Sequence, residues 1–141
     1  MAINKINRND IPEVCRTAKD LANVRAVSFN FHTPYPGTEQ LSLTVSEKEM
    51  CCGRIAEMMD QGMPVFNLKS AFPYIIHNKF HAPCYQCVVM ENGKLSVCGR
   101  CIDVPGLCGQ CGYFFAAEYA LVFEGSLRVI FDMLHTYLRY I

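Results

Sequence analysis

The spacing of the cysteines between residues 84 and 111 constrains this chain more than any other feature of its sequence. They form three successive C-x2-C pairs, separated by ten and then six residues: Cys84, Cys87, Cys98, Cys101, Cys108 and Cys111. Each pair lets two thiolates face one ion from a single tight turn. A loop-rich segment of this kind has little apolar core and depends on metal for its fold. The spacing therefore predicts a metal-binding region.

An Asn-Gly turn stands between the first two cysteine pairs. Residues 88–90 and 95–97 have strand patterns around Asn92-Gly93, and Asn-Gly is the strongest short-range hairpin signal. A hairpin here would bring the first two pairs together at its open end, where four sulfurs can converge. Four cysteine ligands suit both a tetrahedral zinc site and a 4Fe-4S cluster, so spacing alone leaves the metal open. The remaining two cysteines are then spare, bridging, or ligands of a second centre.

The rest of the composition indicates the compartment and excludes some partners. The chain starts without the apolar region of a secretory signal and has no stretch of about 20 apolar residues, so we expect a cytoplasmic protein without a membrane partner. Cytosolic thiols are kept reduced, which favours metal over disulfides for the nine cysteines; in a secreted protein the same spacing would favour disulfides. Thirteen basic residues balance thirteen acidic ones without long runs of either sign, so we expect no nucleic-acid partner.

Other cysteines and histidines are weaker candidates for metal ligands. Cys15, Cys51 and Cys52 lie in predicted helices away from the cluster, and we interpret them as small buried hydrophobic residues. His77 and His81 precede Cys84 and could complete a zinc site, but six cysteines make histidine ligands unnecessary.

Residues 1–80 alternate between helical and strand patterns. Helix starts are predicted from capping signals at Asp10 with Glu13, Ser46 with Glu49, and Ser70, and Gly62 can end the second helix. Strands are predicted at residues 24–31 and 64–68. This alternation favours an α/β class with parallel strands joined by helices. The residues expected to face the interior are Ile11, Val14, Cys15, Ala18, Leu21, Val27, Phe29, Phe31, Met50, Ile55, Met58 and Met59.

The composition changes near residues 79–83, which predicts three regions. Residues 1–80 hold the alternating helices and strands, and residues 81–112 form the cysteine-rich metal-binding region. Residues 113–141 contain two apolar helical patterns, 114–123 and 127–140, divided by Gly125-Ser126.

Three polar residues lie in the loop that follows the first predicted strand. His32, Tyr35 and Glu39 occupy the position where α/β folds place ligand-contacting residues. A turn shaped by proline and glycine, with solvated polar side chains, explains the same sequence. Position alone leaves both interpretations open.

Two blocks of sequence stand out together. The first is Ala26-Val27-Ser28-Phe29-Asn30-Phe31-His32-Thr33-Pro34-Tyr35-Pro36-Gly37-Thr38-Glu39. The second runs from Pro83-Cys84 through Asn92-Gly93, Cys98-Gly99-Arg100-Cys101 and Pro105-Gly106-Leu107-Cys108 to Cys111-Gly112-Tyr113. Together they resemble the C-terminal part of a radical S-adenosylmethionine (radical SAM) enzyme.

The resemblance implies a fold and a cofactor. It implies the last βα units of a partial (β/α) barrel, followed by a small cysteine-rich domain of the SPASM or twitch sort and by C-terminal helices. That domain would carry one auxiliary 4Fe-4S cluster, for electron relay or substrate binding. His32, Tyr35 and Glu39 would contact substrate or S-adenosylmethionine, the latter only in a complete assembly. Because of this resemblance, we expect an iron-sulfur cluster in the cysteine-rich region in preference to zinc.

The chain also departs from this family. The C-x3-C-x2-C loop that holds the radical-generating cluster is absent, and Cys51-Cys52 offers no ligand spacing. We therefore expect a C-terminal portion that is inactive alone. Its partners would be an N-terminal radical SAM half or a second copy, because missing strands leave sheet edges open, and a reductant such as ferredoxin or flavodoxin. The rival hypothesis is a zinc-ribbon interaction module without catalysis, which uses Cys84, Cys87, Cys98 and Cys101.

Overall fold

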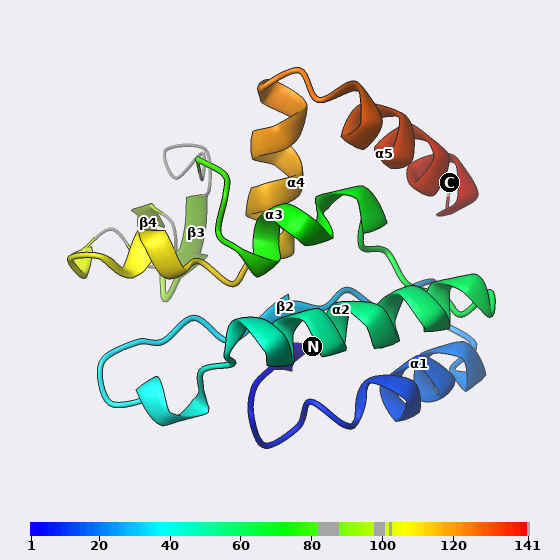
Figure 1. The fold of residues 1–141 in the computed structure, drawn as a ribbon, viewed down its shortest axis with the longest axis horizontal. Helices are drawn as coiled ribbons and strands as arrows, with labels where there is room; N and C mark the ends of the chain where they lie inside the picture. The colour runs from blue at the N-terminus through cyan, green and yellow to red at the C-terminus, as the bar shows by residue number, and fades with distance from the viewer. Residues whose placement is uncertain (82–87, 98–100, 102, 141) are drawn as a thin grey trace.

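The computed structural model describes residues 1–81, 88–97, 101 and 103–140, and combines several helices with a few short strands (Figure 1). In chain order its strands and α-helices are β1 (Ala2–Ile3), α1 (Ile11–Asp20), β2 (Asn30–Phe31), α2 (Val45–Asp60), α3 (Phe72–Ile76), β3 (Val88–Glu91), β4 (Lys94–Val97), α4 (Phe114–Phe123) and α5 (Leu127–Tyr140). Short 3-10 turns occur at Glu39–Leu41, Lys69–Ala71 and Leu107–Gln110. None of the helices in these described ranges is long and apolar enough to cross a membrane.

Three extended segments run parallel to one another. β1 pairs with β2, and upstream of β2 a parallel bridge joins Val27 to Val65. The predicted strands at 24–31 and 64–68 are therefore parallel neighbours, although little of either is regular strand. A side chain explains the interruption: the Phe29 N–H donates to Asn67 Oδ1 at 2.8 Å, and Asn67 Nδ2 donates to the Phe29 carbonyl at 3.0 Å. The pairing of β1 with β2 was not predicted.

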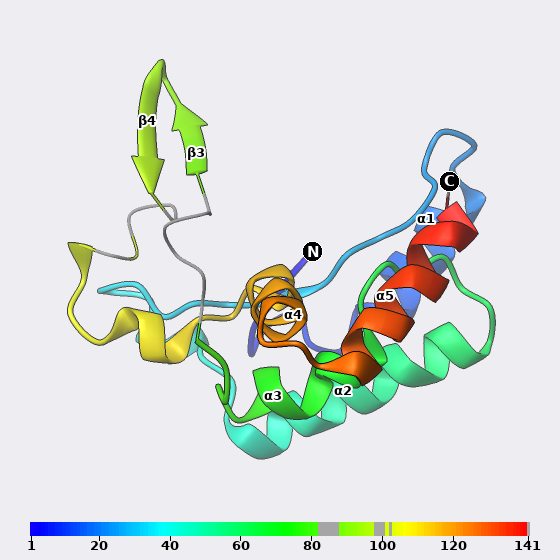
Figure 2. The same cartoon turned by 90° about the horizontal axis from the view of Figure 1, so that it is seen from above.

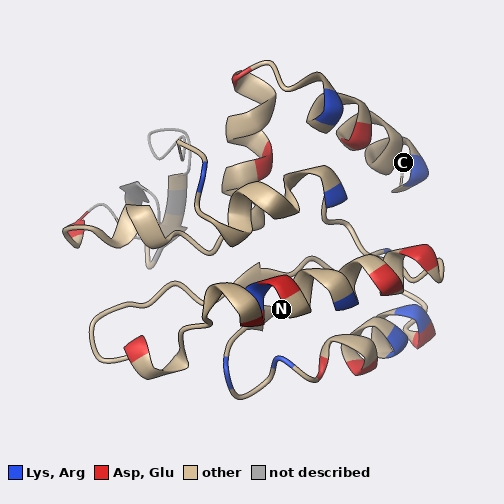
Figure 3. Ribbon diagram, in the orientation of Figure 1, with Lys and Arg blue, Asp and Glu red and all other residues tan. Residues whose placement is uncertain are grey.

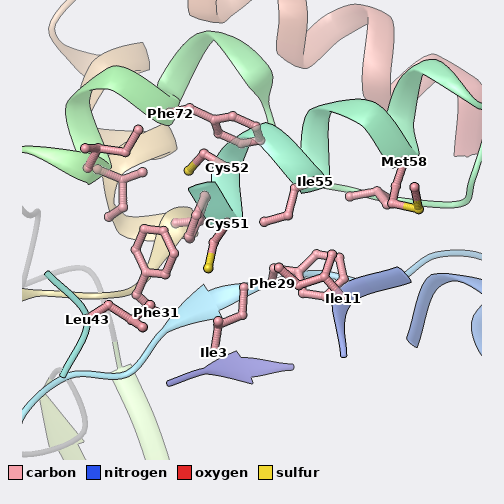
Figure 4. Packing of buried hydrophobic residues seen from close by; sticks show 14 of the residues in the cluster. Ile3, Ile11, Phe29, Phe31, Leu43, Cys51, Cys52, Ile55, Met58 and Phe72 are labelled. Carbon is pink, nitrogen blue, oxygen red and sulfur yellow. The ribbon is translucent and has the colours of Figure 1, made fainter. Parts of the chain in front are cut away.

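The main core lies between these extended segments and the helices (Figure 4). Phe29 and Phe31 are buried, as the alternating pattern predicted. Cys51 points from α2 toward the strands, and Cys52 lies beside Phe72 of α3. Phe114, the first residue of α4, belongs to the same core, with its ring 4.8 Å from that of Phe31. The C-terminal helices are thus packed onto the first 80 residues.

The first predicted capping box is wrong. α1 starts after Asp10, but the Asp10 carboxylate makes no capping hydrogen bond. Its backbone is helical, with φ −85° and ψ −3°, whereas a capping side chain reaches back from an extended residue. Ile11, Cys15 and Ala18 are buried as predicted. Leu21 was expected on the same face, but it lies beyond the helix end and is 53% exposed.

The second capping box lies two residues earlier than predicted. The Glu47 N–H donates to Thr44 Oγ1 at 3.2 Å, and the Thr44 N–H donates to Glu47 Oε2 at 2.8 Å. Ser46 and Glu49 do not form the box. The helix turns Cys51 and Cys52 inward together with Ile55 and Met58, while Met50, expected in the interior, is 43% exposed. Gly62 ends α2 as predicted, in a left-handed conformation with φ +74°.

Ser70 does not cap α3. It lies in the 3-10 turn that precedes this helix, and both its N–H and its hydroxyl donate to Asp132 Oδ2, at 2.9 and 2.7 Å. Asp132 belongs to α5, so the serine joins the end of the third extended segment to the last helix. The signal was interpreted as local, but its partner is 62 residues away.

Two main-chain donors of the predicted strands, both expected at open sheet edges, find acceptors elsewhere in the chain. The Phe31 N–H donates to the Gly112 carbonyl at 2.8 Å, and the Leu68 N–H donates to Glu118 Oε1 of α4 at 2.9 Å. The expectation of open donors is therefore wrong at these two positions, where Gly112 and Glu118 supply the acceptors.

The predicted hairpin and the two C-terminal helices are confirmed. β3 and β4 pair antiparallel from Val88 opposite Val97 to Glu91 opposite Lys94. Asn92 and Gly93 have positive φ angles of 51° and 73°, as a two-residue hairpin turn requires. Figure 2 shows this hairpin standing away from the helices. α4 and α5 are separated at Gly125, whose φ is +79°.

Candidate functional site

The loop after β2 lies against the end of the cysteine-rich region. The Tyr35 hydroxyl is 2.8 Å from the Cys101 Sγ, a contact between residues 66 positions apart. The same two regions together line an open pocket of about 250 Å³, the loop with Pro34, Pro36, Glu39 and Ser42 and the cysteine-rich region with Val104, Pro105, Leu107 and Gln110. The two regions that the sequence singled out separately therefore form one surface.

Gly112 attaches the cysteine-rich region to β2. Its N–H donates to Thr33 Oγ1 at 3.1 Å, and its carbonyl accepts from the Phe31 N–H. The Phe114 N–H donates to Asn30 Oδ1 at 3.0 Å. These bonds fix the chain immediately after Cys111 at the point where β2 gives way to the loop.

A second attachment comes from α2 and the end of α3. Asn78 Nδ2 donates to the Gly109 carbonyl at 2.6 Å, and Lys48 Nζ lies 3.4 Å from Asn78 Oδ1. Asn78 has a φ of +50°, a conformation that asparagine tolerates better than most residues. The last cysteine pair is thus held from both sides, by the residues around β2 and by Asn78 after α3.

Lys48 places a positive charge beside Cys111. Partial burial lowers the pKa of the ammonium group, and the neighbouring thiols of Cys52 and Cys111 oppose that effect. The same ammonium lies 5.6 Å from the centre of the Phe31 ring.

The three predicted loop residues differ in their surroundings. His32 Nε2 lies 3.0 Å from Thr38 Oγ1 and 3.2 Å from the Thr38 carbonyl, so its ring is engaged within the loop. Glu39 is exposed at the start of a 3-10 turn and lines the pocket. Tyr35 reaches the cysteine-rich region. His32 is therefore engaged within its own loop, whereas Tyr35 contacts the cysteine-rich region and Glu39 lines the pocket. Ligand contact by these three residues stays a prediction.

The structure describes part of the predicted cysteine cluster. Cys101 and Cys111 are buried and Cys108 is exposed, whereas Cys84, Cys87 and Cys98 lie outside the described residues. Among the residues with described positions, no group of three or more histidine, cysteine or acidic side chains could hold a metal ion. The hairpin pairs Val88 with Val97, the sequence neighbours of Cys87 and Cys98. The predicted four-sulfur site stays a prediction.

No family model, curated protein or solved structure matches this chain. The chemistry of the site is therefore inferred from its own residues.

Cys15, Cys51 and Cys52 are small buried residues, as predicted. Burial raises the pKa of each of the three thiols. They therefore stay protonated near neutral pH, which suits packing rather than nucleophilic or ligand chemistry. His77 and His81 are both exposed, and His81 Nδ1 lies 3.7 Å from Oε1 of Glu124, the residue that follows α4.

The sequence interpretation overlooked a buried carboxylate. Glu118 of α4 is buried, accepts from the Leu68 N–H, and interacts with the side chain of Asn67. Burial raises its pKa to about 7, and the nearby Asp132 carboxylate acts in the same direction. The sequence feature that could have revealed it is that Glu118 is the single acidic residue within the apolar run 114–123. It positions the end of the third extended segment.

Few charged residues surround the candidate site. Figure 3 shows lysines, arginines and acidic residues on α1, α2 and α5, while the turn at Leu107–Gln110 and the start of α4 have none.

Proposed function

We propose that this chain is the C-terminal portion of a radical SAM-type enzyme and that its cysteine-rich region holds one auxiliary 4Fe-4S cluster. Such a cluster relays electrons or holds substrate. The observation that carries the proposal is the contact of Tyr35 with Cys101, which joins the loop after β2 to the cysteine-rich region. The resemblance implied that the loop of His32, Tyr35 and Glu39 and the cysteine cluster face one cavity, and this contact supports that arrangement.

The donor set fits an iron-sulfur cluster. Four of Cys84, Cys87, Cys98, Cys101, Cys108 and Cys111 would be the ligands, and cysteine thiolates are the usual ligands of such clusters. A cluster held by four thiolates carries net negative charge. Burial of Cys101 and Cys111, a hydroxyl at the Cys101 sulfur and an ammonium beside Cys111 all suit such a group. When bound, the cluster supplies one-electron chemistry.

The parallel segments support the barrel part of the proposal. β1, β2 and the segment around Val65, with α1 and α2 between them in sequence, have the order of βα units. The loop of residues 32–39 follows the carboxyl end of β2, which is where (β/α) barrels place ligand-binding residues. In a complete assembly an N-terminal radical SAM half or a second copy would supply further strands and S-adenosylmethionine, and a cytoplasmic ferredoxin or flavodoxin would supply electrons.

A zinc-ribbon module is the second candidate, and one observation favours it. The β3–β4 hairpin stands away from the helices, with a C-x2-C pair adjoining each end in sequence. In a zinc ribbon Cys84, Cys87, Cys98 and Cys101 would form a closed tetrahedral site that stabilises the hairpin.

Metal analysis of anaerobically reconstituted protein separates the two candidates. An iron-sulfur protein should be brown and hold about four irons and four sulfides per chain. Replacing Cys98 and Cys101 together with alanine should abolish iron binding, because too few ligands remain. A matched double variant, Cys51→Ala with Cys52→Ala, removes as many thiols elsewhere and should retain iron. Unchanged iron in the first variant, or a colourless protein that retains zinc, would contradict the iron-sulfur proposal.

A further inference from the structure

Tyr35 contacts one of the proposed cluster ligands directly. Its hydroxyl oxygen lies 2.8 Å from the Cys101 Sγ, and Cys101 is only 3% exposed. This contact is part of how the loop after β2 meets the cysteine-rich region. Solvent water has little access to the Cys101 side chain.

The protonation state of the sulfur decides the direction of this hydrogen bond. A neutral cysteine thiol and a tyrosine hydroxyl can each donate to the other. A cysteine sulfur bound to iron has lost its proton and can only accept. With metal bound, the Tyr35 hydroxyl must therefore be the donor.

We propose that Tyr35 sets the reduction potential of the auxiliary cluster by donating a hydrogen bond to the Cys101 sulfur. This inference rests on the proposed iron-sulfur function. Reduction adds one electron to the cluster and increases the negative charge on its sulfurs. A hydrogen-bond donor stabilises the reduced state more than the oxidised state, so it raises the potential. Tyr35 is a positioning residue in this sense and not a ligand.

The local sequence suits this role. Tyr35 stands between Pro34 and Pro36, whose rings restrict the backbone on both sides. Within the loop, the Thr38 N–H and hydroxyl both donate to the Tyr35 carbonyl, at 2.9 and 2.8 Å. A restrained backbone reduces the entropy lost when the hydroxyl is held at the sulfur.

The test uses Tyr35→Phe, which removes only the hydroxyl oxygen. The reconstituted full chain is titrated electrochemically under anaerobic conditions, with the cluster followed by its absorbance and its electron paramagnetic resonance signal. We expect the variant to hold as much iron as the unmodified chain but to show a midpoint at a more negative potential. Tyr74→Phe, at an exposed tyrosine of α3, is the matched control and should leave the midpoint unchanged.

The outcomes separate this inference from the proposed function. If the unmodified chain binds no iron, the proposed function fails before Tyr35 is tested. If Tyr35→Phe holds the full amount of iron at an unshifted or more positive midpoint, the inference is overturned and the iron-sulfur proposal stands. Loss of iron from Tyr35→Phe alone would also overturn it, because the residue would then be needed for assembly of the site instead of its potential.

Discussion

Gly112 lies directly against the main chain of Phe31. A Cβ at position 112 would lie 2.1 Å from the Phe31 carbonyl oxygen and 2.6 Å from its carbonyl carbon. Contacts this short with backbone atoms cannot be relieved by turning a side chain. The residue after the last cysteine must therefore be glycine for the cysteine-rich region to attach to β2 as it does.

We expect Gly112→Ala to weaken this attachment. The added methyl group must push the chain away from β2 and disturb the hydrogen bonds to Phe31 and Thr33, which should lower the free energy of unfolding by roughly 1–3 kcal/mol. Urea unfolding followed by circular dichroism measures the change. Gly109→Ala is the control, because nothing lies within 4 Å of the added Cβ. Equal stability of the two variants would contradict the close packing.

Glu118 should make stability depend on pH. Its pKa is about 7 in the folded chain and near 4.5 when exposed, so the folded state binds the proton more tightly. The contribution of this proton to stability is complete below pH 4.5 and is lost as the pH rises through 7. Its size is at most about 3 kcal/mol. In Glu118→Gln, which keeps an oxygen for the Leu68 N–H, this pH dependence should disappear.

Denaturant unfolding at several values between pH 5 and pH 8 tests the role of Glu118. The unmodified chain should lose stability relative to Glu118→Gln as the pH rises. Glu57→Gln, at an exposed position of α2, removes the same charge and should follow the unmodified chain. Parallel pH profiles for all three proteins would contradict this prediction, because ionisation of Glu118 would then leave the free energy of unfolding unchanged.

Two similar capping signals lie at the start of α2, and replacing the first residue of each with alanine shows which one caps the helix. Thr44→Ala should lower the free energy of unfolding by about 1 kcal/mol, because the Glu47 N–H loses its acceptor. Ser46→Ala changes a residue inside the first turn and should have little effect or stabilise slightly. The midpoints of thermal unfolding compare the two variants. A larger loss in Ser46→Ala would favour the box predicted from sequence.

The isolated chain should not generate a 5′-deoxyadenosyl radical. It lacks the C-x3-C-x2-C loop that radical SAM enzymes use to cleave S-adenosylmethionine. Given S-adenosylmethionine and a strong reductant, it should yield 5′-deoxyadenosine only at background level, measured by liquid chromatography and mass spectrometry. A complete radical SAM enzyme provides the positive control. Substantial turnover would mean that the cysteine-rich region itself holds a radical-generating cluster.

The sequence by itself determined the features that depend on a few consecutive residues. Asn92-Gly93 specified the β3–β4 turn because these residues adopt positive φ at little cost. Gly62 specified the end of α2 for the same reason. The period-2 pattern placed Phe29 and Phe31 in the core. The cysteine spacing predicted a metal region, and three of its cysteines lie outside the described residues, so this part of the site stays a prediction.

Only the tertiary structure decided features that depend on distant residues. Local pattern could not choose between Thr44 with Glu47 and Ser46 with Glu49, because both pairs have the spacing of a capping box. The partners of Ser70, Leu68 and Tyr35 lie 62, 50 and 66 residues away along the chain. Such contacts form when packing brings separate segments together and buried polar groups must find partners, a requirement that no local sequence pattern encodes.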